Sequence, residues 1–239
     1  MLRSLSFYIK LIISVLFLIP SMLKAKKIKN ENVLACKKFS YPIIHKWAKK
    51  RVKDTGAKIT VYGKENLPKD GCALFVSNHL SNFDFLVLLA EINDPFAYIA
   101  KIELKKIPLA NIWIDCLGCL LMDRDDMRQQ LKIINEGISI LKNKENLLIF
   151  PEGTRSKNGK MLPFKAGSFK LATKAKVPIV PITLIGSADV LENNNYKIYP
   201  ADIKVYIHKP IFTENLEKEE EGNLHIIVQS IISEPLKEL

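Results

Sequence analysis

The sequence predicts an α/β domain with a mixed, largely parallel sheet flanked by helices, preceded by a helical segment that associates with a membrane. From Ile59 onward, short apolar runs alternate with stretches of helical periodicity, as in strands joined by crossover helices. Before that point lie the longest apolar run and the excess positive charge. We therefore divide the 239 residues into an anchoring segment, residues 1–54, and a globular domain, residues 55–239.

The net charge of +11 is concentrated in the first quarter of the chain. Residues 1–60 contain 14 Lys or Arg and two acidic residues, whereas the rest of the chain contains 22 basic and 23 acidic residues. Clustered cations attract the phosphates of nucleic acids and of anionic membranes alike. Because the same quarter contains the longest apolar run, we expect an anionic bilayer surface as the partner and no nucleic acid.

That apolar run is Leu11–Leu23, thirteen uncharged residues between Lys10 and Lys24. A helix perpendicular to the bilayer needs about 20 apolar residues, so this run is short for a span. A signal peptide is the competing interpretation, since a basic residue precedes a short apolar core. No small-residue cleavage motif follows, and the run ends among lysines, which favours an uncleaved anchor.

Residues 33–52 form a second candidate membrane helix. Apolar side chains recur at near-helical spacing with a basic complement, and Tyr41 and Trp47 favour the headgroup region. Pro42 is expected to kink or divide this helix. The two helices either lie in one leaflet, or a short span is followed by an interfacial helix. Alternatively, the second helix packs on the globular domain and exposes its basic face to solvent.

The globular part is interpreted from its apolar runs and turn residues. Strands are predicted where short apolar runs are bounded by turn or polar residues, at 59–63, 72–77, 96–100, 119–123, 147–150, 178–184 and 203–207. Helices are predicted at 84–92, 104–116, 125–141, 167–175 and in the C-terminal stretch. The third of these has Met127, Leu131 and Ile134 on one face.

The four cysteines include a C-x-x-C pair, Cys116 and Cys119, which is a spacing found in zinc and redox sites. A second such pair is missing from the sequence, the four histidines are scattered, and the residues around Cys116 are apolar. We therefore expect thiols packed as small hydrophobic groups, and neither a metal nor a redox function.

The first candidate for chemistry is the segment Ser77–Asp84, where a buried strand gives way to a helix. His79 is followed five residues later by Asp84, close enough for the carboxylate to bind one imidazole nitrogen. A carboxylate so placed sets the tautomer and stabilises the imidazolium that forms during catalysis. No nucleophilic side chain is needed if an alcohol substrate arrives, because His79 can remove its proton. Alternatively, the two residues form a helix-capping pair.

The second candidate is the loop Phe150–Ser156, which follows a predicted strand. Its glycine, the Thr154 hydroxyl and the planar Arg155 guanidinium suit a cluster of anionic oxygens. Arg124 and Lys101 each follow another strand and add further cations. For each of these residues, a solvated or salt-bridged surface position is the plain alternative.

Four segments in order resemble the motifs of the glycerolipid acyltransferases, specifically the bacterial 1-acyl-sn-glycerol-3-phosphate acyltransferase family. They are Asn78-His79 with Asp84, Gly118–Arg124, Phe150–Arg155 and Val177–Ile182. Together they cover about residues 60–185.

The resemblance implies that His79 is the general base and that Asp84 orients it. It implies an acceptor phosphate and glycerol site of Arg124, Glu152, Gly153, Thr154 and Arg155, with Lys101 as a further phosphate contact. It assigns no chemistry to the strand Pro178–Ile182, which shapes the pocket.

The implied reaction transfers an acyl group to the sn-2 hydroxyl of lysophosphatidic acid, forming phosphatidic acid. The donor is acyl-CoA or acyl carrier protein, with no metal or other cofactor. The implied location is the cell membrane, with the active site on the cytoplasmic side. The alternatives are another acceptor such as glycerol 3-phosphate, a lipid hydrolase, and a lipid-binding protein without catalysis.

Overall fold

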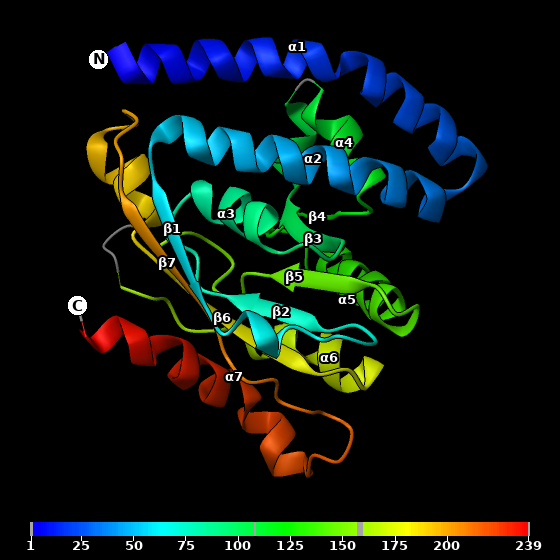
Figure 1. Ribbon diagram of the computed structural model, residues 1–239. Coiled ribbons are helices and arrows are strands. Elements are labelled where there is room, and N and C mark those ends of the chain that lie inside the picture. The colour runs from blue at the N-terminus through cyan, green and yellow to red at the C-terminus, as the bar shows by residue number, and fades with distance from the viewer. Residues whose placement is uncertain (1, 108, 157–159, 239) are drawn as a thin grey trace.

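A seven-stranded mixed sheet lies between two layers of helices in the computed structural model, which describes residues 2–107, 109–156 and 160–238. Helices α1 to α4 cover one face and α5 to α7 the other (Figure 1). The strands are β1 (Lys58–Tyr62), β2 (Leu74–Ser77), β3 (Phe96–Lys101), β4 (Leu120–Met122), β5 (Asn146–Ile149), β6 (Ile179–Ile185) and β7 (Asp202–Ile207). The helices are α1 (Leu2–Glu31), α2 (Val33–Thr55), α3 (Phe83–Glu91), α4 (Ala110–Cys116), α5 (Met127–Lys142), α6 (Lys170–Ala175) and α7 (Lys218–Ser233).

The strand order is β1-β7-β6-β2-β5-β3-β4. Strands β6, β2, β5, β3 and β4 are parallel to one another, β7 is antiparallel to β6, and β1 is parallel to β7. The predicted mixed, largely parallel sheet is therefore confirmed. Each predicted strand begins and ends within two residues of the observed bounds. The predicted helix at 104–116 is shorter, because residues 102–106 form a separate 3₁₀ turn.

The sheet has its switch point between β2 and β5. From β2 the chain continues through α3 to β3 and β4 on one side, whereas from β5 it continues through α6 to β6 on the other. The two crossover helices lie on opposite faces of the sheet (Figure 1). In open α/β sheets, ligands bind beyond the carboxyl ends of two neighbouring strands whose outgoing connections run in opposite directions.

Helices α1 and α2 form an antiparallel hairpin that turns at Asn32. The Asn32 side chain accepts a hydrogen bond from the Ala35 amide at 2.8 Å, and α2 ends at Gly56, whose left-handed φ of 81° favours glycine. Helix α2 is continuous through Pro42, so the expected division of this helix does not occur. Pro42 lies on the exposed side of the helix.

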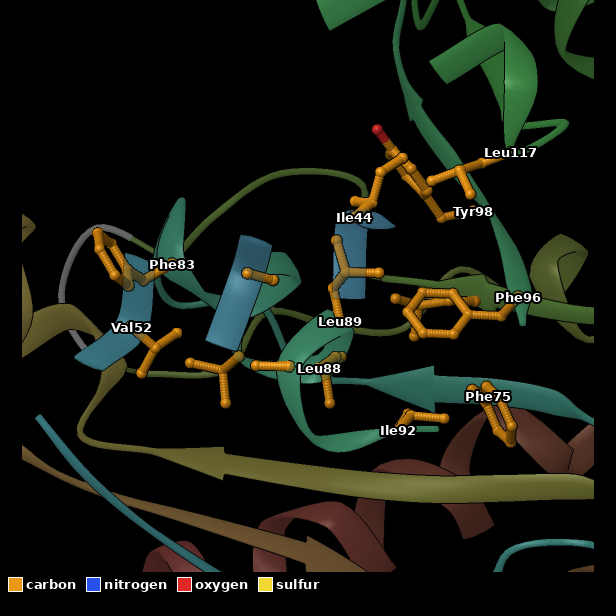
Figure 2. Packing of buried hydrophobic residues seen from close by; sticks show 14 of the residues in the cluster. Ile44, Val52, Phe75, Phe83, Leu88, Leu89, Ile92, Phe96, Tyr98 and Leu117 are labelled. Carbon is orange, nitrogen blue, oxygen red and sulfur yellow. The ribbon is translucent and has the colours of Figure 1, made fainter. Parts of the chain in front are cut away.

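Helix α2 packs on the sheet layer through α3. Ile44 and Val52 lie beside Leu88 and Leu89 of α3 (Figure 2), and all four side chains are buried. The Tyr41 hydroxyl donates to the Ile92 carbonyl at 3.0 Å. For residues 33–52, the sequence left open a membrane helix or a helix that packs on the globular domain, and the structure has the second arrangement. The division of the chain at residue 54 stays a prediction.

The cysteines are packed as thiols. Cys36, Cys72 and Cys116 are buried, and burial raises the pKa of Cys116 to about 12. Within the described residues, no three His, Cys, Asp or Glu side chains are grouped to hold a metal ion. The geometry agrees with the interpretation of these thiols as small hydrophobic groups.

We expect Ile44→Ala to lower the free energy of unfolding in detergent by about 2–5 kcal/mol, because it leaves a cavity between α2 and α3. Chemical denaturation measures this change. The exposed neighbour Lys50→Ala serves as the control and should change it by less than about 0.5 kcal/mol. Equal, small effects of both variants would mean that α2 does not stabilise the domain.

Candidate active site

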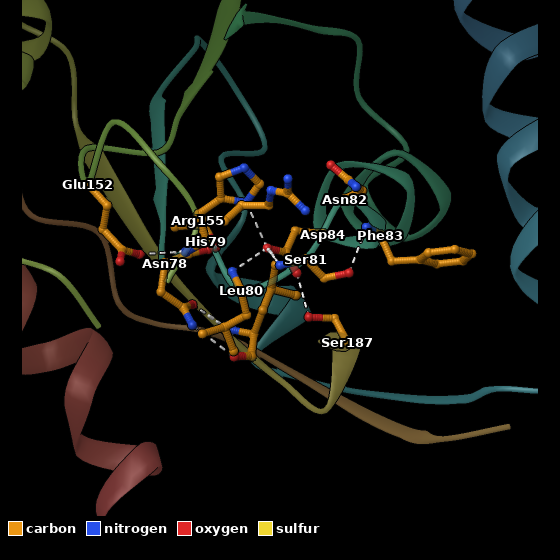
Figure 3. A network of polar contacts seen from close by, with 12 residues as sticks. Asn78, His79, Leu80, Ser81, Asn82, Phe83, Asp84, Glu152, Arg155 and Ser187 are labelled. Atoms are coloured by element: carbon orange, nitrogen blue, oxygen red, sulfur yellow. Dashed lines mark hydrogen bonds and ion pairs between the residues drawn. The ribbon is translucent and has the colours of Figure 1, made fainter. Parts of the chain in front are cut away.

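His79 and Asp84 lie together at the carboxyl edge of the sheet, where β2 passes into α3. The imidazole Nδ1 is 2.8 Å from Asp84 Oδ2 (Figure 3). Because a carboxylate accepts, Nδ1 carries the proton and Nε2 presents a lone pair. Nε2 has no hydrogen-bond partner among the described residues, so it is available to a substrate.

The Asp84 carboxylate is fully buried and receives three further hydrogen bonds. Its Oδ2 accepts from the backbone amides of Leu80 at 2.6 Å and Ser81 at 2.8 Å. Its Oδ1 accepts from the Ser187 hydroxyl at 2.5 Å, in the turn that follows β6. Four donors around a carboxylate compensate for its removal from water, so this arrangement suits the ionised form.

The loop after β5 holds the backbone of His79 on both sides. The His79 amide donates to Glu152 Oε1 at 2.6 Å, and the His79 carbonyl accepts from the Ser156 amide at 3.0 Å. The imidazole stacks on the Phe150 ring, with centroids 4.2 Å apart and planes inclined by 19°. The two segments singled out in the sequence are therefore one structural unit.

Glu152 is buried, and both of its carboxylate oxygens bind backbone amides. Oε2 accepts from the Leu162 amide at 2.7 Å, which complements the bond from His79 to Oε1. Burial raises the pKa of Glu152, and these two amides counteract the rise. Its direct contact with an acceptor, expected from the resemblance, stays a prediction.

Arg155 is held by a carboxylate that the sequence analysis did not single out. Its Nη1 lies 2.9 Å from Glu192 Oε1, and its side chain is 36% exposed. Gly153 has a left-handed φ of 74°, and an added Cβ would lie 2.9 Å from the Lys165 ammonium. Thr154 is exposed beside it. These three consecutive residues thus border the edge of the sheet near His79.

Lys101 and Arg124 lie farther along the same edge, at the ends of β3 and β4. Parallel strands are about 4.8 Å apart, so these residues begin roughly 10 and 14 Å from the end of β2. Lys101 pairs with Glu103, and this contact lowers the pKa of the Glu103 carboxyl. Burial lowers the pKa of Arg124. Both cations therefore follow strands at the same edge of the sheet as His79, two and three strands away from β2, and their contact with an acceptor phosphate stays a prediction.

Sequence reasoning missed Ser187 and Glu192, which contact Asp84 and Arg155. A signal existed for Ser187, because it follows the predicted strand that ends near Leu184 and so belongs to the same edge of the sheet. Glu192 lies in a 3₁₀ turn, Glu192–Asn194, with no motif that marks it.

Comparison with known proteins adds independent information. The model of the Acyltransferase family matches residues 58–185. The 1-acyl-sn-glycerol-3-phosphate acyltransferase of Borreliella burgdorferi is 30% identical over 182 residues, which are 76% of this chain and 73% of that protein. The chloroplastic 1-acyl-sn-glycerol-3-phosphate acyltransferase of Brassica napus is 36% identical over 157 residues, 65% of this chain and 45% of that protein. The chain thus spans less than half the length of this plant relative.

A solved structure extends the likeness over the whole chain. The crystal structure of the 1-acyl-sn-glycerophosphate acyltransferase of Thermotoga maritima superposes with a TM-score of 0.84 at 30% sequence identity. The match covers 99% of this chain and 94% of that one, so it includes the α1–α2 hairpin. The chain belongs to the acyltransferase family, among the 1-acyl-sn-glycerol-3-phosphate acyltransferases.

Proposed function

We propose that this protein transfers an acyl group from a thioester to the sn-2 hydroxyl of 1-acyl-sn-glycerol 3-phosphate, forming phosphatidic acid. The observation that carries the proposal is the His79–Asp84 pair, in which a buried carboxylate binds Nδ1 while Nε2 has no hydrogen-bond partner in the part of the chain that the structure describes. The likeness to relatives with this named activity supports it.

In the proposed mechanism, His79 Nε2 removes the proton of the acceptor hydroxyl as its oxygen attacks the thioester carbonyl. The tetrahedral intermediate collapses, the carbon–sulfur bond breaks, and the imidazolium returns the proton to the leaving thiolate. Asp84 stabilises the imidazolium throughout. General-base assistance of this kind typically contributes about 100- to 10,000-fold.

The acceptor phosphate is proposed to bind at the loop after β5. Arg155 and Thr154 supply donors there, and Gly153 allows close approach of the backbone. Arg124 and Lys101 extend the positive potential along the edge, while Glu152 supports the site through the His79 amide. Holding the phosphate in one place sets the glycerol hydroxyl near Nε2 and provides several kcal/mol by proximity.

The α1–α2 hairpin is proposed to hold the cleft at an anionic bilayer. Helix α1 is long and apolar enough to cross a membrane, with a mean hydropathy of 2.0 over its most apolar window and 11% of that window buried, although a signal sequence would pass the same test. A groove of about 960 Å³ runs between the two helices. Its lining includes six cations, Arg3, Lys10, Lys46, Lys49, Lys50 and Lys53. The donor, acyl-CoA or acyl carrier protein, is cytosolic, which favours a cytoplasmic active site.

The first test is phosphatidic acid formation by purified protein in liposomes, with lysophosphatidic acid and either acyl donor. We expect product from the wild type and a loss of about 100- to 10,000-fold in His79→Ala, because the general base is absent. Circular dichroism and thermal unfolding show whether the variant is folded. Similar rates for both proteins would refute the role of His79, and free fatty acid without an acceptor would indicate hydrolysis.

We expect Arg155→Ala and Asp84→Asn to separate binding from catalysis. Loss of the phosphate contact should raise the acceptor KM at least about 10-fold with a smaller change in kcat. Loss of the orienting carboxylate should lower kcat by about 100-fold or more with little change in KM. Steady-state kinetics with lysophosphatidic acid measure both. The exposed Arg128→Ala is the control for charge, and equal effects on KM alone would contradict the assignment.

We expect Ser187→Ala to lower kcat about 10-fold with an unchanged acceptor KM. A hydrogen bond to a charged group contributes about 1.5–3 kcal/mol, and its loss loosens the carboxylate that orients His79. The exposed Ser139→Ala serves as the matched control. An unchanged kcat would show that the three remaining donors hold Asp84 sufficiently.

A further inference from the structure

Glu192 binds three donors that belong to two parts of the active site. Its Oε1 accepts from Arg155 Nη1 at 2.9 Å and from the Asn82 amide at 2.8 Å. Its Oε2 accepts from the Ser81 hydroxyl at 2.5 Å. Ser81 and Asn82 lie in the His79 loop, immediately before α3, whereas Arg155 lies in the loop after β5. One carboxylate therefore bridges the two loops.

The Glu192 carboxylate is largely buried, and the chain segment that follows it is hydrogen-bonded to α1. The Glu192 side chain is only 16% exposed, so its ion pair is less screened by water than a surface pair. The segment that follows it is bonded to α1: the Ile198 amide donates to Ser4 Oγ at 3.0 Å, and the Tyr8 hydroxyl donates to the Tyr196 carbonyl at 3.0 Å. The segment after Glu192 is thus held against α1, which limits the freedom of Glu192 to follow Arg155.

We propose that Glu192 is a positioning residue that sets the distance between the phosphate-binding guanidinium of Arg155 and the His79 base. Arginine has a long side chain, and without a fixed partner it samples many rotamers. Glu192 engages Nη1 and ties it to the same loop that carries His79. Because the phosphate and the reacting hydroxyl belong to one small acceptor, a displaced guanidinium would move that hydroxyl away from Nε2.

Glu192 could instead compete with the acceptor phosphate for Arg155, and this role predicts a different result. A carboxylate beside Arg155 also lowers the local positive potential, so it could compete with the acceptor phosphate for the guanidinium. Competition predicts tighter acceptor binding when the negative charge is removed. Positioning predicts weaker binding when the bridge is removed, and near-normal binding when an uncharged acceptor oxygen remains. Alanine and glutamine therefore separate the two roles.

The inference rests on the proposed function, and its test compares Glu192→Ala, Glu192→Gln and the matched control Asn193→Ala, an exposed residue of the same turn. Acceptor KM and kcat are measured with lysophosphatidic acid. We expect Glu192→Ala to raise KM about 10-fold, because a mobile Arg155 binds the phosphate less well, and to lower kcat by a smaller factor, because the hydroxyl then lies less often near Nε2. Glu192→Gln should stay within about 3-fold of the wild type, because its amide oxygen can still accept from Arg155 and Asn82. Asn193→Ala should leave both constants unchanged.

A double-mutant cycle shows whether Glu192 acts through Arg155. In the Arg155→Ala background, Glu192→Ala should change KM by less than about 2-fold, since the residue that it positions is gone. A full 10-fold effect in that background would overturn the proposal, as would an unchanged or lower KM in Glu192→Ala.

Equilibrium binding of lysophosphatidic acid in detergent, measured by calorimetry, tests the positioning role of Glu192 independently of acyl transfer. If the wild type forms no phosphatidic acid but Glu192→Ala still weakens binding about 10-fold and Glu192→Gln does not, the proposed function fails and the positioning role stands. If binding is equal in all folded variants, the positioning role is wrong whatever the turnover. Thermal unfolding identifies any variant that is not folded.

Discussion

The buried carboxylate of Asp84 is the constraint on which the site depends. An ionised group removed from water destabilises the fold by several kcal/mol unless donors surround it, and here four donors do so. Leu80 and Ser81 donate from their backbone amides, so the His79 loop bends around the carboxylate. Ser187 supplies a hydroxyl from the turn after β6, and His79 supplies Nδ1. The Asp84 carboxylate therefore sets the conformation of the His79 loop, selects the imidazole tautomer and joins the ends of β2 and β6.

The order of the strands brings the His79 loop and the loop after β5 together at one edge of the sheet. Because β2 and β5 are adjacent but lead to helices on opposite faces, their loops meet at the edge of the sheet and then diverge. Two hydrogen bonds to the His79 backbone join the two loops: the Glu152 carboxylate accepts from the His79 amide, and the Ser156 amide donates to the His79 carbonyl. The base and the phosphate-binding residues proposed for the second loop therefore share one rigid support, which Glu192 completes from a third segment.

The N-terminal hairpin belongs to this support as well as to the proposed membrane surface. Helix α2 covers α3 with buried side chains, and Phe7 of α1 packs against Phe83, with ring centroids 6.0 Å apart. Phe83 directly precedes Asp84. Helix α1 also bonds the segment after Glu192. Helix α1 thus exposes apolar side chains on its outer side, the side proposed to meet a membrane, and on its inner side packs against segments next to Asp84 and Glu192.

Local patterns in the sequence are enough to predict the α/β class, the seven strands of the described residues, and the segments that carry His79, Asp84 and Arg155, because strand period, helical period and motif order are local properties. How these segments combine depends on their packing in three dimensions. Glu192 has no local signal, since its contacts with Ser81 and Arg155 join residues far apart in the chain. The second helix likewise showed a basic, amphipathic pattern that fits either a membrane or a protein surface. Its packing on α3 depends on shape complementarity across the core, which composition and periodicity do not encode.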